Sequence, residues 1–196
     1  MIIVGLTGNL ASGKSEVAKI FKRLGAHVFD ADEVSHRLMR KGTDIHRAIA
    51  KIFGDAFLAG NGELDRHKLA ERAFSHPKDL KKLNTLIHPG VILEAYRAIE
   101  KGKGKKGVVV LDVPLLFEAG IEKIADFTVM VTSNEKVMLR RARKRGVDRA
   151  LAKKILRSQW PSAKKAKLAH YVIRNDGTPK QLAAKVKAVF ERIDRT

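Results

Sequence analysis

The chain has 196 residues, and 40 Lys and Arg against 21 Asp and Glu give it a formal net charge of +19 with histidine neutral. With 44% apolar residues in strand-sized runs it can bury a core, which excludes a disordered protein, but it lacks the roughly 20 consecutive apolar residues of a membrane span. The absence of cysteine excludes disulfides and thiolate chemistry, and the first residues lack a signal-peptide pattern, so we expect a cytoplasmic protein.

Short apolar runs alternate with longer segments of helical periodicity, which is typical of an α/β fold with a mainly parallel sheet flanked by helices. The predicted strands span residues 2–6, 27–29, 108–111, 127–131 and 171–173. The first, third and fourth are apolar almost throughout, as strands covered on both faces are. We therefore place these three strands at the centre of a five-stranded sheet.

The first strand leads into a glycine-rich loop. Residues 8–15, Gly-Asn-Leu-Ala-Ser-Gly-Lys-Ser, fit the pattern G-x-x-x-x-G-K-[ST] between a predicted strand and a predicted helix. Gly8 and Gly13 let successive backbone N–H groups face phosphate oxygens, and the helix that follows adds its positive end. Lys14 would contact the β- and γ-phosphates, and the Ser15 hydroxyl would bind magnesium. The loop predicts a nucleoside triphosphate site.

The second strand ends next to two carboxylates, Asp30 and Asp32. Both follow the strand at the edge where the glycine-rich loop lies, so one can position the phosphoryl acceptor while the other accepts its proton. The alternative is a capping pair at the start of the helix through Val34 and Leu38. The spacing leaves both interpretations open.

A long helical insertion, residues 31–104, separates the second and third strands. Within it, Asp65 is a candidate helix cap, and Pro77 and Pro89 indicate helix starts. His88 fits either a turn or a ligand contact. The lysine- and glycine-rich residues 101–107 lack the spacing of a phosphate loop and indicate a flexible linker.

The third strand ends at Asp112. A carboxylate at the carboxyl end of a central strand beside a phosphate loop is placed to hold magnesium, often through water. The alternative is a helix cap.

A basic segment, residues 134–169, separates the fourth and fifth strands. Residues 101–196 hold 24 basic and 9 acidic side chains, so this half carries +15 of the net charge. Many cations of the segment lie three or four residues apart and would share one face of a helix. Their positive charges repel one another unless an anion binds to this face. A solvated basic surface is the alternative, and the charge is equally compatible with nucleic acid, nucleotide phosphates or an anionic membrane.

The order of several motifs resembles the dephospho-coenzyme A kinase family, and the resemblance covers nearly the whole chain. The matching segments are the phosphate loop, residues 30–34, Leu83-Asn84 with His88-Pro89, residues 113–118 (Val-Pro-Leu-Leu-Phe-Glu), residues 62–66, Gln159 with Pro161, and residues 169–175. The resemblance implies transfer of the ATP γ-phosphoryl group to the ribose 3′-hydroxyl of dephospho-coenzyme A, the last step of coenzyme A synthesis.

The resemblance also implies roles for individual residues and segments. The catalytic residues would be Asp32 as general base, Lys14 and the lid residue Arg140. ATP would contact Gly8, Ala11, Ser12, Gly13, Lys14, Ser15, Glu16 and Asn175, and the acceptor would contact Asp32, His88, Leu115, Leu116 and Glu118. Residues 1–30, 105–133 and 170–196 would form the nucleotide-binding core, 31–104 the coenzyme A domain and 134–169 the lid. We expect ATP, dephospho-coenzyme A and Mg²⁺ at Ser15 and Asp112, and a monomer without obligatory nucleic acid or membrane partners.

The chain departs from the family pattern at four positions. Asn9 replaces a common glycine of the phosphate loop, Lys144 replaces a lid arginine, and His170 and Arg174 replace frequent aspartates. Arg143 and Arg145 flank Lys144, whose ammonium lacks the two-pronged geometry of a guanidinium. Two other functions stay open: a phosphate-loop kinase with another small acceptor, and an RNA-binding protein that uses the basic half and Trp160.

Overall fold

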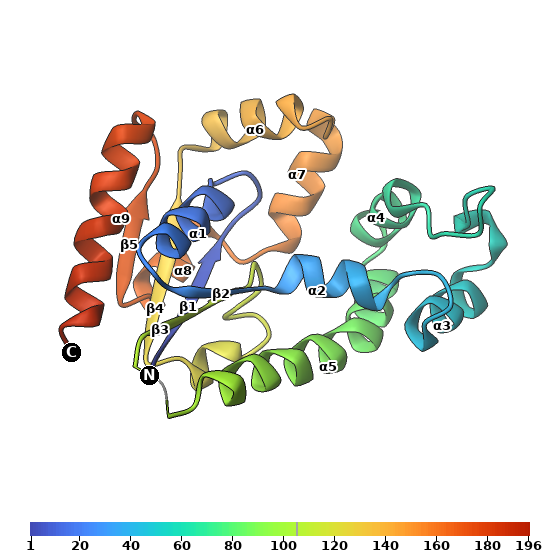
Figure 1. Ribbon diagram of the computed structural model, residues 1–196. Helices are drawn as coiled ribbons and strands as arrows, with labels where there is room; N and C mark the ends of the chain where they lie inside the picture. Colours follow the sequence, from blue (N-terminus) through green and yellow to red (C-terminus); the bar gives the residue numbers. More distant parts are fainter. Residues whose placement is uncertain (105) are drawn as a thin grey trace. The chain divides into compact units, whose positions relative to one another are not determined.

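The computed structural model describes residues 1–104 and 106–196, in which strands and helices alternate (Figure 1). The elements are β1 (Ile2–Gly8), α1 (Lys14–Arg23), β2 (His27–Asp30), α2 (Ala31–Leu38), α3 (Asp44–Phe53), η1 (Asp55–Phe57), α4 (Arg66–Ser75), α5 (Pro77–Gly102), β3 (Val108–Asp112), η2 (Ile121–Ile124), β4 (Phe127–Thr132), α6 (Glu135–Lys144), α7 (Arg149–Ser158), α8 (Ser162–Leu168), β5 (Tyr171–Arg174) and α9 (Pro179–Asp194).

Within the described residues, five strands form one sheet in the order β2-β3-β1-β4-β5, and every neighbouring pair is parallel. The α/β class, the five strands and the central place of β1, β3 and β4 are confirmed. Each strand continues one or two residues past its predicted end, because polar or small residues such as Gly8, Asp112 and Thr132 carry no apolar signal. These carboxyl-end residues form the edge of the sheet at which the candidate site lies.

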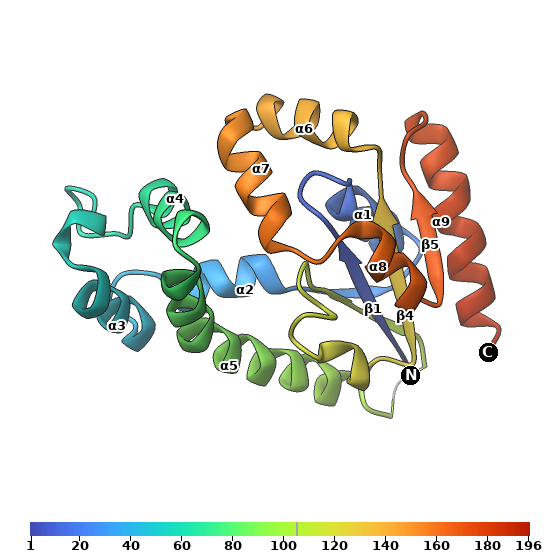
Figure 2. The same ribbon diagram turned by 180° about the vertical axis from the view of Figure 1, so that it is seen from behind.

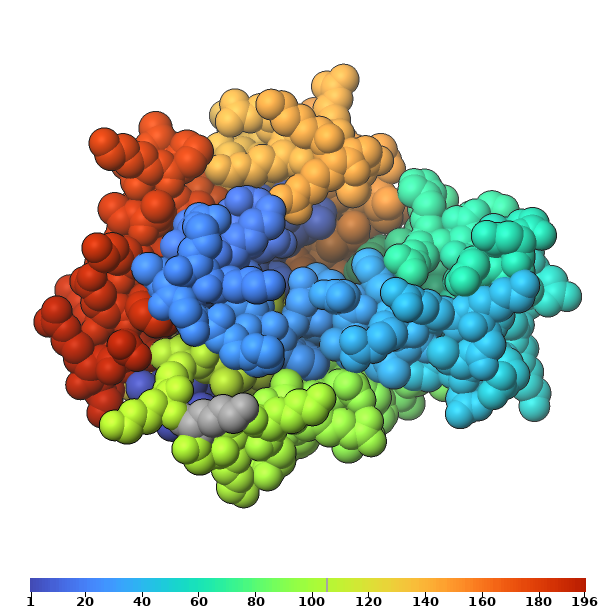
Figure 3. All heavy atoms as spheres, viewed as in Figure 1, coloured from blue at the N-terminus to red at the C-terminus, as the bar shows by residue number. Residues whose placement is uncertain are grey.

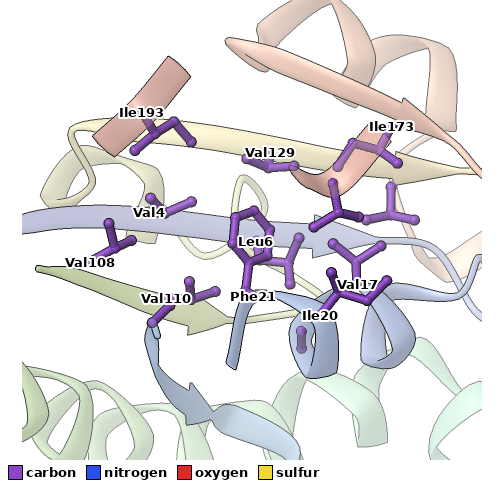
Figure 4. Packing of buried hydrophobic residues seen from close by; sticks show 14 of the residues in the cluster. Val4, Leu6, Val17, Ile20, Phe21, Val108, Val110, Val129, Ile173 and Ile193 are labelled. Carbon is purple, nitrogen blue, oxygen red and sulfur yellow. The ribbon is translucent and has the colours of Figure 1, made fainter. Parts of the chain in front are cut away.

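One face of the sheet packs against α1 and α9. Val4 and Leu6 of β1 alternate toward this face and meet Phe21 of α1, and all three side chains are fully buried (Figure 4). Ile193 of α9 belongs to the same cluster. Residues spaced three or four apart on each helix thus bury one stripe against the strands, as the helical periodicity predicts.

The other face of the sheet lies under α8 and the segment that follows β3. Figures 1 and 2, which view the sheet from opposite sides, show α1 and α8 on opposite faces. Gly5 of β1 leaves room there for Leu116, since a Cβ on Gly5 would lie 2.8 Å from Leu116 Cδ2. The result is a three-layer core with the phosphate loop at its carboxyl edge.

The chain divides into two compact units, one formed by Met1–Asp30 with Arg97–Thr196 and the other by Ala31–Tyr96. The second unit is helical, and Ile49, Leu64 and Leu69 form its small core. Asp65 caps α4 as predicted, because its side chain accepts a hydrogen bond from the Lys68 backbone N–H. No helix of the described residues is both long and apolar enough to cross a membrane.

Two predictions for the insertion were wrong. Pro89 starts no helix, because α5 runs through it from Pro77 to Gly102. The buried neighbours Ile87 and Val91 hold this turn by packing, which outweighs the hydrogen bond that proline cannot donate. The linker predicted at 101–107 begins as the end of α5, and Lys105, where a domain boundary was predicted, lies outside the described residues.

Candidate active site

The phosphate loop joins β1 to α1, whose first residue is Lys14. Gly13 has φ +98°, a left-handed conformation that favours glycine, and a Cβ there would lie 2.0 Å from Asn175 Nδ2. Ala11 also has positive φ, at +56°. The loop therefore holds a strained, close-wrapped backbone in front of the positive end of α1, which is the geometry that cradles a phosphate.

Lys14 is buried and forms an ion pair with Asp112 at the end of β3. The strand register explains this contact, because Asp112 is paired with Leu6 of β1, two residues before the loop begins. Asp112 is 1% exposed. A carboxylate and an ammonium thus neutralise each other beneath the loop.

The sequence predicts only two protein ligands for magnesium, Ser15 and Asp112, and a small number of protein ligands is compatible with this ion. Within the described part of the chain, no three or more His, Cys, Asp and Glu side chains gather as a metal site. Magnesium that accompanies nucleotide phosphates uses only one or two protein oxygens and keeps several waters. The exposed Ser15 hydroxyl and the Asp112 carboxylate are oxygen donors of this kind, so the donor set fits magnesium better than a metal that needs a protein cage.

The two carboxylates after β2 have different surroundings. Asp30 is the last residue of β2 and is paired with Asp112 of β3, which places it at the same sheet edge. Asp32 lies in the first turn of α2, within the helical unit, and its side chain is exposed. The strand register thus places Asp30 at the carboxyl edge of the sheet, where the phosphate loop lies. The role of Asp32 stays a prediction.

Asn175, the residue after β5, supports the phosphate loop. Its amide Nδ2 donates to the Ser12 carbonyl at 2.9 Å, and its buried side chain fills the space beside Gly13. Arg141 of α6 reaches the same place, since its guanidinium donates to the carbonyls of Ser12, at 3.3 Å, and Asn175, at 3.1 Å. Figure 3 shows the gold residues of α6 beside the blue residues of the phosphate loop and α1.

Arg141 was not singled out from the sequence, because only its place on α6 distinguishes it from its basic neighbours. The predicted lid residue Arg140 is exposed on the same helix, as are Arg143 and Lys144, and Arg145 is exposed directly after the helix ends. Asp176 was also missed. Its Oδ1 accepts from the Asn134 backbone N–H and the Ser133 hydroxyl, both at 2.7 Å, and the backbone hydrogen bond chiefly lowers the pKa of Asp176.

The residues after β3 that were predicted to contact the phosphoryl acceptor differ in burial. Glu118 Oε1 accepts from Lys165 Nζ at 2.7 Å and from the Trp160 backbone N–H at 2.9 Å. Burial lowers the pKa of Lys165 although Glu118 opposes this shift. Leu116 is fully buried beneath the sheet, so its side chain supports the site from the core, while Leu115 is partly exposed.

His88 lies in the middle of α5, in the helical unit, and is partly buried. Burial lowers the pKa of His88, so its neutral imidazole is favoured. A neutral ring offers one donor and one acceptor, which suits a polar contact better than a fixed charge.

Comparison with known proteins identifies the family. The family model for dephospho-CoA kinase matches residues 2–181. Curated dephospho-CoA kinases of Geobacillus kaustophilus and Fusobacterium nucleatum are 38% and 40% identical to this chain, covering 98% of it and 97% and 99% of those proteins. The chain belongs to the dephospho-CoA kinase family. It is therefore a phosphotransferase, and the resemblance stated from the sequence is confirmed.

The solved structures agree with this result. A crystal structure of a protein from Thermus thermophilus superimposes with a TM-score of 0.79 at 33% identity and covers 97% of both chains. The likeness thus extends over both compact units and is not confined to the phosphate loop, which many nucleotide-binding proteins share.

Proposed function

We propose that this chain transfers the γ-phosphoryl group of ATP to the ribose 3′-hydroxyl of dephospho-coenzyme A, giving coenzyme A and ADP. Membership of the dephospho-CoA kinase family over residues 2–181 carries this proposal. The phosphate loop supports it, because the left-handed Gly13 and the buried Lys14 form an anion cradle at the start of α1. A mechanism of this kind needs positioning and charge neutralisation and no covalent enzyme intermediate.

The reaction assigns distinct tasks to the residues. The backbone of residues 8–13 and Lys14 orient the phosphates, and the oxygen of the acceptor hydroxyl bonds to the γ-phosphorus as the bond to the β–γ bridging oxygen breaks. Asp32 accepts the hydroxyl proton, and arginines of the lid, Arg140 among them, neutralise charge on the transferred group. Ser15 and Asp112 would hold magnesium, which supplies charge neutralisation at the phosphates when bound.

The two units have separate proposed tasks. The helical unit, Ala31–Tyr96, would bind the coenzyme A part of the acceptor, and His88, Leu115 and Glu118 would contact it. Helices α6 to α8 would form the lid over the phosphates. Closure around the nucleotide would exclude water, which otherwise accepts the phosphoryl group.

The first test is an acceptor panel. Magnesium-dependent ADP release from ATP is measured with dephospho-coenzyme A, a nucleoside, a nucleoside monophosphate or shikimate as acceptor. We expect stimulation by dephospho-coenzyme A alone, with coenzyme A as product. Use of another acceptor would overturn the proposed acceptor contacts but not the phosphate-loop chemistry, and no turnover with any acceptor would favour a binding protein.

A second test separates the two carboxylates at the end of β2. Asp32→Asn should reduce turnover about 100-fold or more with ATP affinity nearly unchanged, because the amide cannot accept the proton. Asp30→Asn is the matched control, since it changes a carboxylate two residues away at the nucleotide edge. If Asp30→Asn abolishes turnover and Asp32→Asn does not, the base is Asp30.

A further inference from the structure

Two adjacent residues of the phosphate loop are hydrogen-bonded to the segment between α7 and α8. Asn9 Nδ2 donates to the Trp160 carbonyl at 3.0 Å, and the Leu10 backbone N–H donates to Gln159 Oε1 at 3.0 Å. We call these four residues the clasp. Because α7 ends at Ser158 and α8 starts at Ser162, the clasp holds the point where the chain returns from the lid helices to the core.

The backbone of Trp160 is held from a second side. Its N–H donates to Glu118 Oε1, so its carbonyl contacts the phosphate loop and its N–H contacts the segment after β3. Lys165, which is fully buried, anchors the same Glu118 and also donates to the Pro114 carbonyl at 3.0 Å. Trp160 thus bridges the nucleotide-binding loop and the loop that the proposed function assigns to the acceptor.

The Asn9 amide donates to this bridge through Nδ2, whereas its buried Oδ1 has no hydrogen-bond partner among the described residues. Asn9 is 5% exposed, and the Trp160 carbonyl that it faces accepts hydrogen bonds only, which fixes the amide with its NH₂ group toward Trp160. Breaking a buried hydrogen bond leaves a desolvated carbonyl without its donor. Movement of the phosphate loop at Asn9 would therefore change a contact with Trp160, which lies between α7 and α8.

We propose that Asn9 is a positioning residue that couples nucleotide binding in the phosphate loop to the placement of residues 159–161, and through them to the lid. Asn9 stands where the sequence departs from the common glycine, so this coupling belongs to this chain's own residues. The part of the proposal that concerns ATP turnover rests on the proposed function, whereas the coupling itself concerns nucleotide binding alone.

Trp160 makes the proposal measurable, because it is the single tryptophan of the sequence. The ammonium of Lys164 lies 3.3 Å from the centre of its ring, so we expect the indole emission to change when this contact changes. We expect the emission of the intact protein to change when ADP or ATP is added, with binding measured in parallel by calorimetry. In Asn9→Ala, nucleotide should still bind, but most of the emission change should be lost.

Kinetics supply the second measurement. Asn9→Ala should raise the KM for ATP about fivefold, as expected for one net hydrogen bond, and leave the KM for dephospho-coenzyme A unchanged. Ser158→Ala is the matched control, since that hydroxyl donates to the Ile155 carbonyl within α7.

The outcomes distinguish the two proposals. A wild-type emission response and a wild-type KM for ATP in Asn9→Ala would overturn the coupling, as would nucleotide binding to the wild type without any emission change. If Asn9→Ala fails to fold, by circular dichroism, Asn9→Gly carries the same expectations. Loss of the emission response in these variants, together with no turnover of dephospho-coenzyme A by the wild type, would support the coupling and contradict the proposed function.

Discussion

Lys14 and Asp112 form an ion pair from which water is largely excluded, with 10% and 2% of their side chains exposed. Two buried charges are tolerated only when each has a partner, so removal of one leaves the other at a high desolvation cost. The same lysine is the residue that we expect to contact the nucleotide phosphates. Stability and binding are therefore linked at one side chain.

Lys14→Ala should abolish detectable ATP binding and lower the free energy of unfolding by about 3–5 kcal/mol, since Asp112 loses its buried counter-charge. Urea denaturation and calorimetry with ATP measure the two effects. Lys19→Ala, on the same helix, is the control, because Lys19 is 64% exposed in its pair with Glu16 and should cost less than about 1 kcal/mol. Unchanged ATP affinity in Lys14→Ala would contradict the phosphate-loop role.

Asp176 makes stability depend on acid pH. Its folded-state pKa is lowered, chiefly by the Asn134 backbone N–H and next by the Ser133 hydroxyl, whereas its unfolded pKa stays near the ordinary 3.8. A carboxyl with a depressed pKa stabilises the fold above its unfolded pKa and loses that contribution as pH falls through the folded pKa. The affected window therefore lies at and below about pH 4.

Asp176→Asn should lower the free energy of unfolding at neutral pH and flatten its decline below about pH 4, as measured by urea denaturation across this range. The readout is the difference between wild type and variant, so other carboxyl groups contribute equally to both. Parallel curves for the two proteins at all pH values would show that this hydrogen-bonded carboxylate adds nothing to the pH dependence.

Functional residues that follow a short, fixed spacing could be predicted from the sequence, whereas residues that act through long-range contacts could not. The phosphate loop was predictable because its glycines, Lys14 and Ser15 act through fixed short spacing. The contacts of Asn9 with Trp160 and of Glu118 with Lys165 were not, because they join residues far apart in the chain that only the folded sheet brings together. Roles that need a ligand, such as those of Asp32 and Arg140, stay predictions.

At the scale of elements, α5 shows how packing outweighs a local signal. Pro89 and Gly90 favour a break in the helix, and the sequence predicts a helix start there. The helix continues, because the buried residues on both sides of the pair belong to one apolar stripe. The predicted strands ended too early for a related reason. Polar residues such as Asp30 continue the strand pairing, but they add nothing to the apolar pattern from which strands are predicted.

Pro89→Ala should raise the free energy of unfolding by about 1–3 kcal/mol, because alanine restores a backbone donor and proline is about 3 kcal/mol less favourable in a helix interior. Chemical denaturation gives the value. Gly90→Ala is the neighbouring comparison and should gain less, since its Cβ would lie 2.9 Å from Leu38 Cδ1, which must move. Destabilisation by Pro89→Ala would mean that the proline holds a conformation that the fold requires.

At the scale of the whole molecule, a charge of +19 attracts any polyanion. We expect RNA association to be weak and nonspecific, and to fall steeply between about 50 and 200 mM salt because it depends on counterion release. Filter binding at the two salt concentrations measures it, with turnover of dephospho-coenzyme A assayed with and without RNA. Tight binding that persists at the higher salt would revive the RNA-binding alternative.

The strand order also constrains how the protein emerges during synthesis. β1 pairs with β3 and β4, and β2 pairs with β3, so neither of the first two strands has a pairing partner until residues after 107 have been made. The helical unit, Ala31–Tyr96, is synthesised before that point and has its own small core. The unit that is completed last therefore includes the beginning of the chain. Its phosphate loop gains the Asp112 and Asn175 contacts only after most of the polypeptide has been translated.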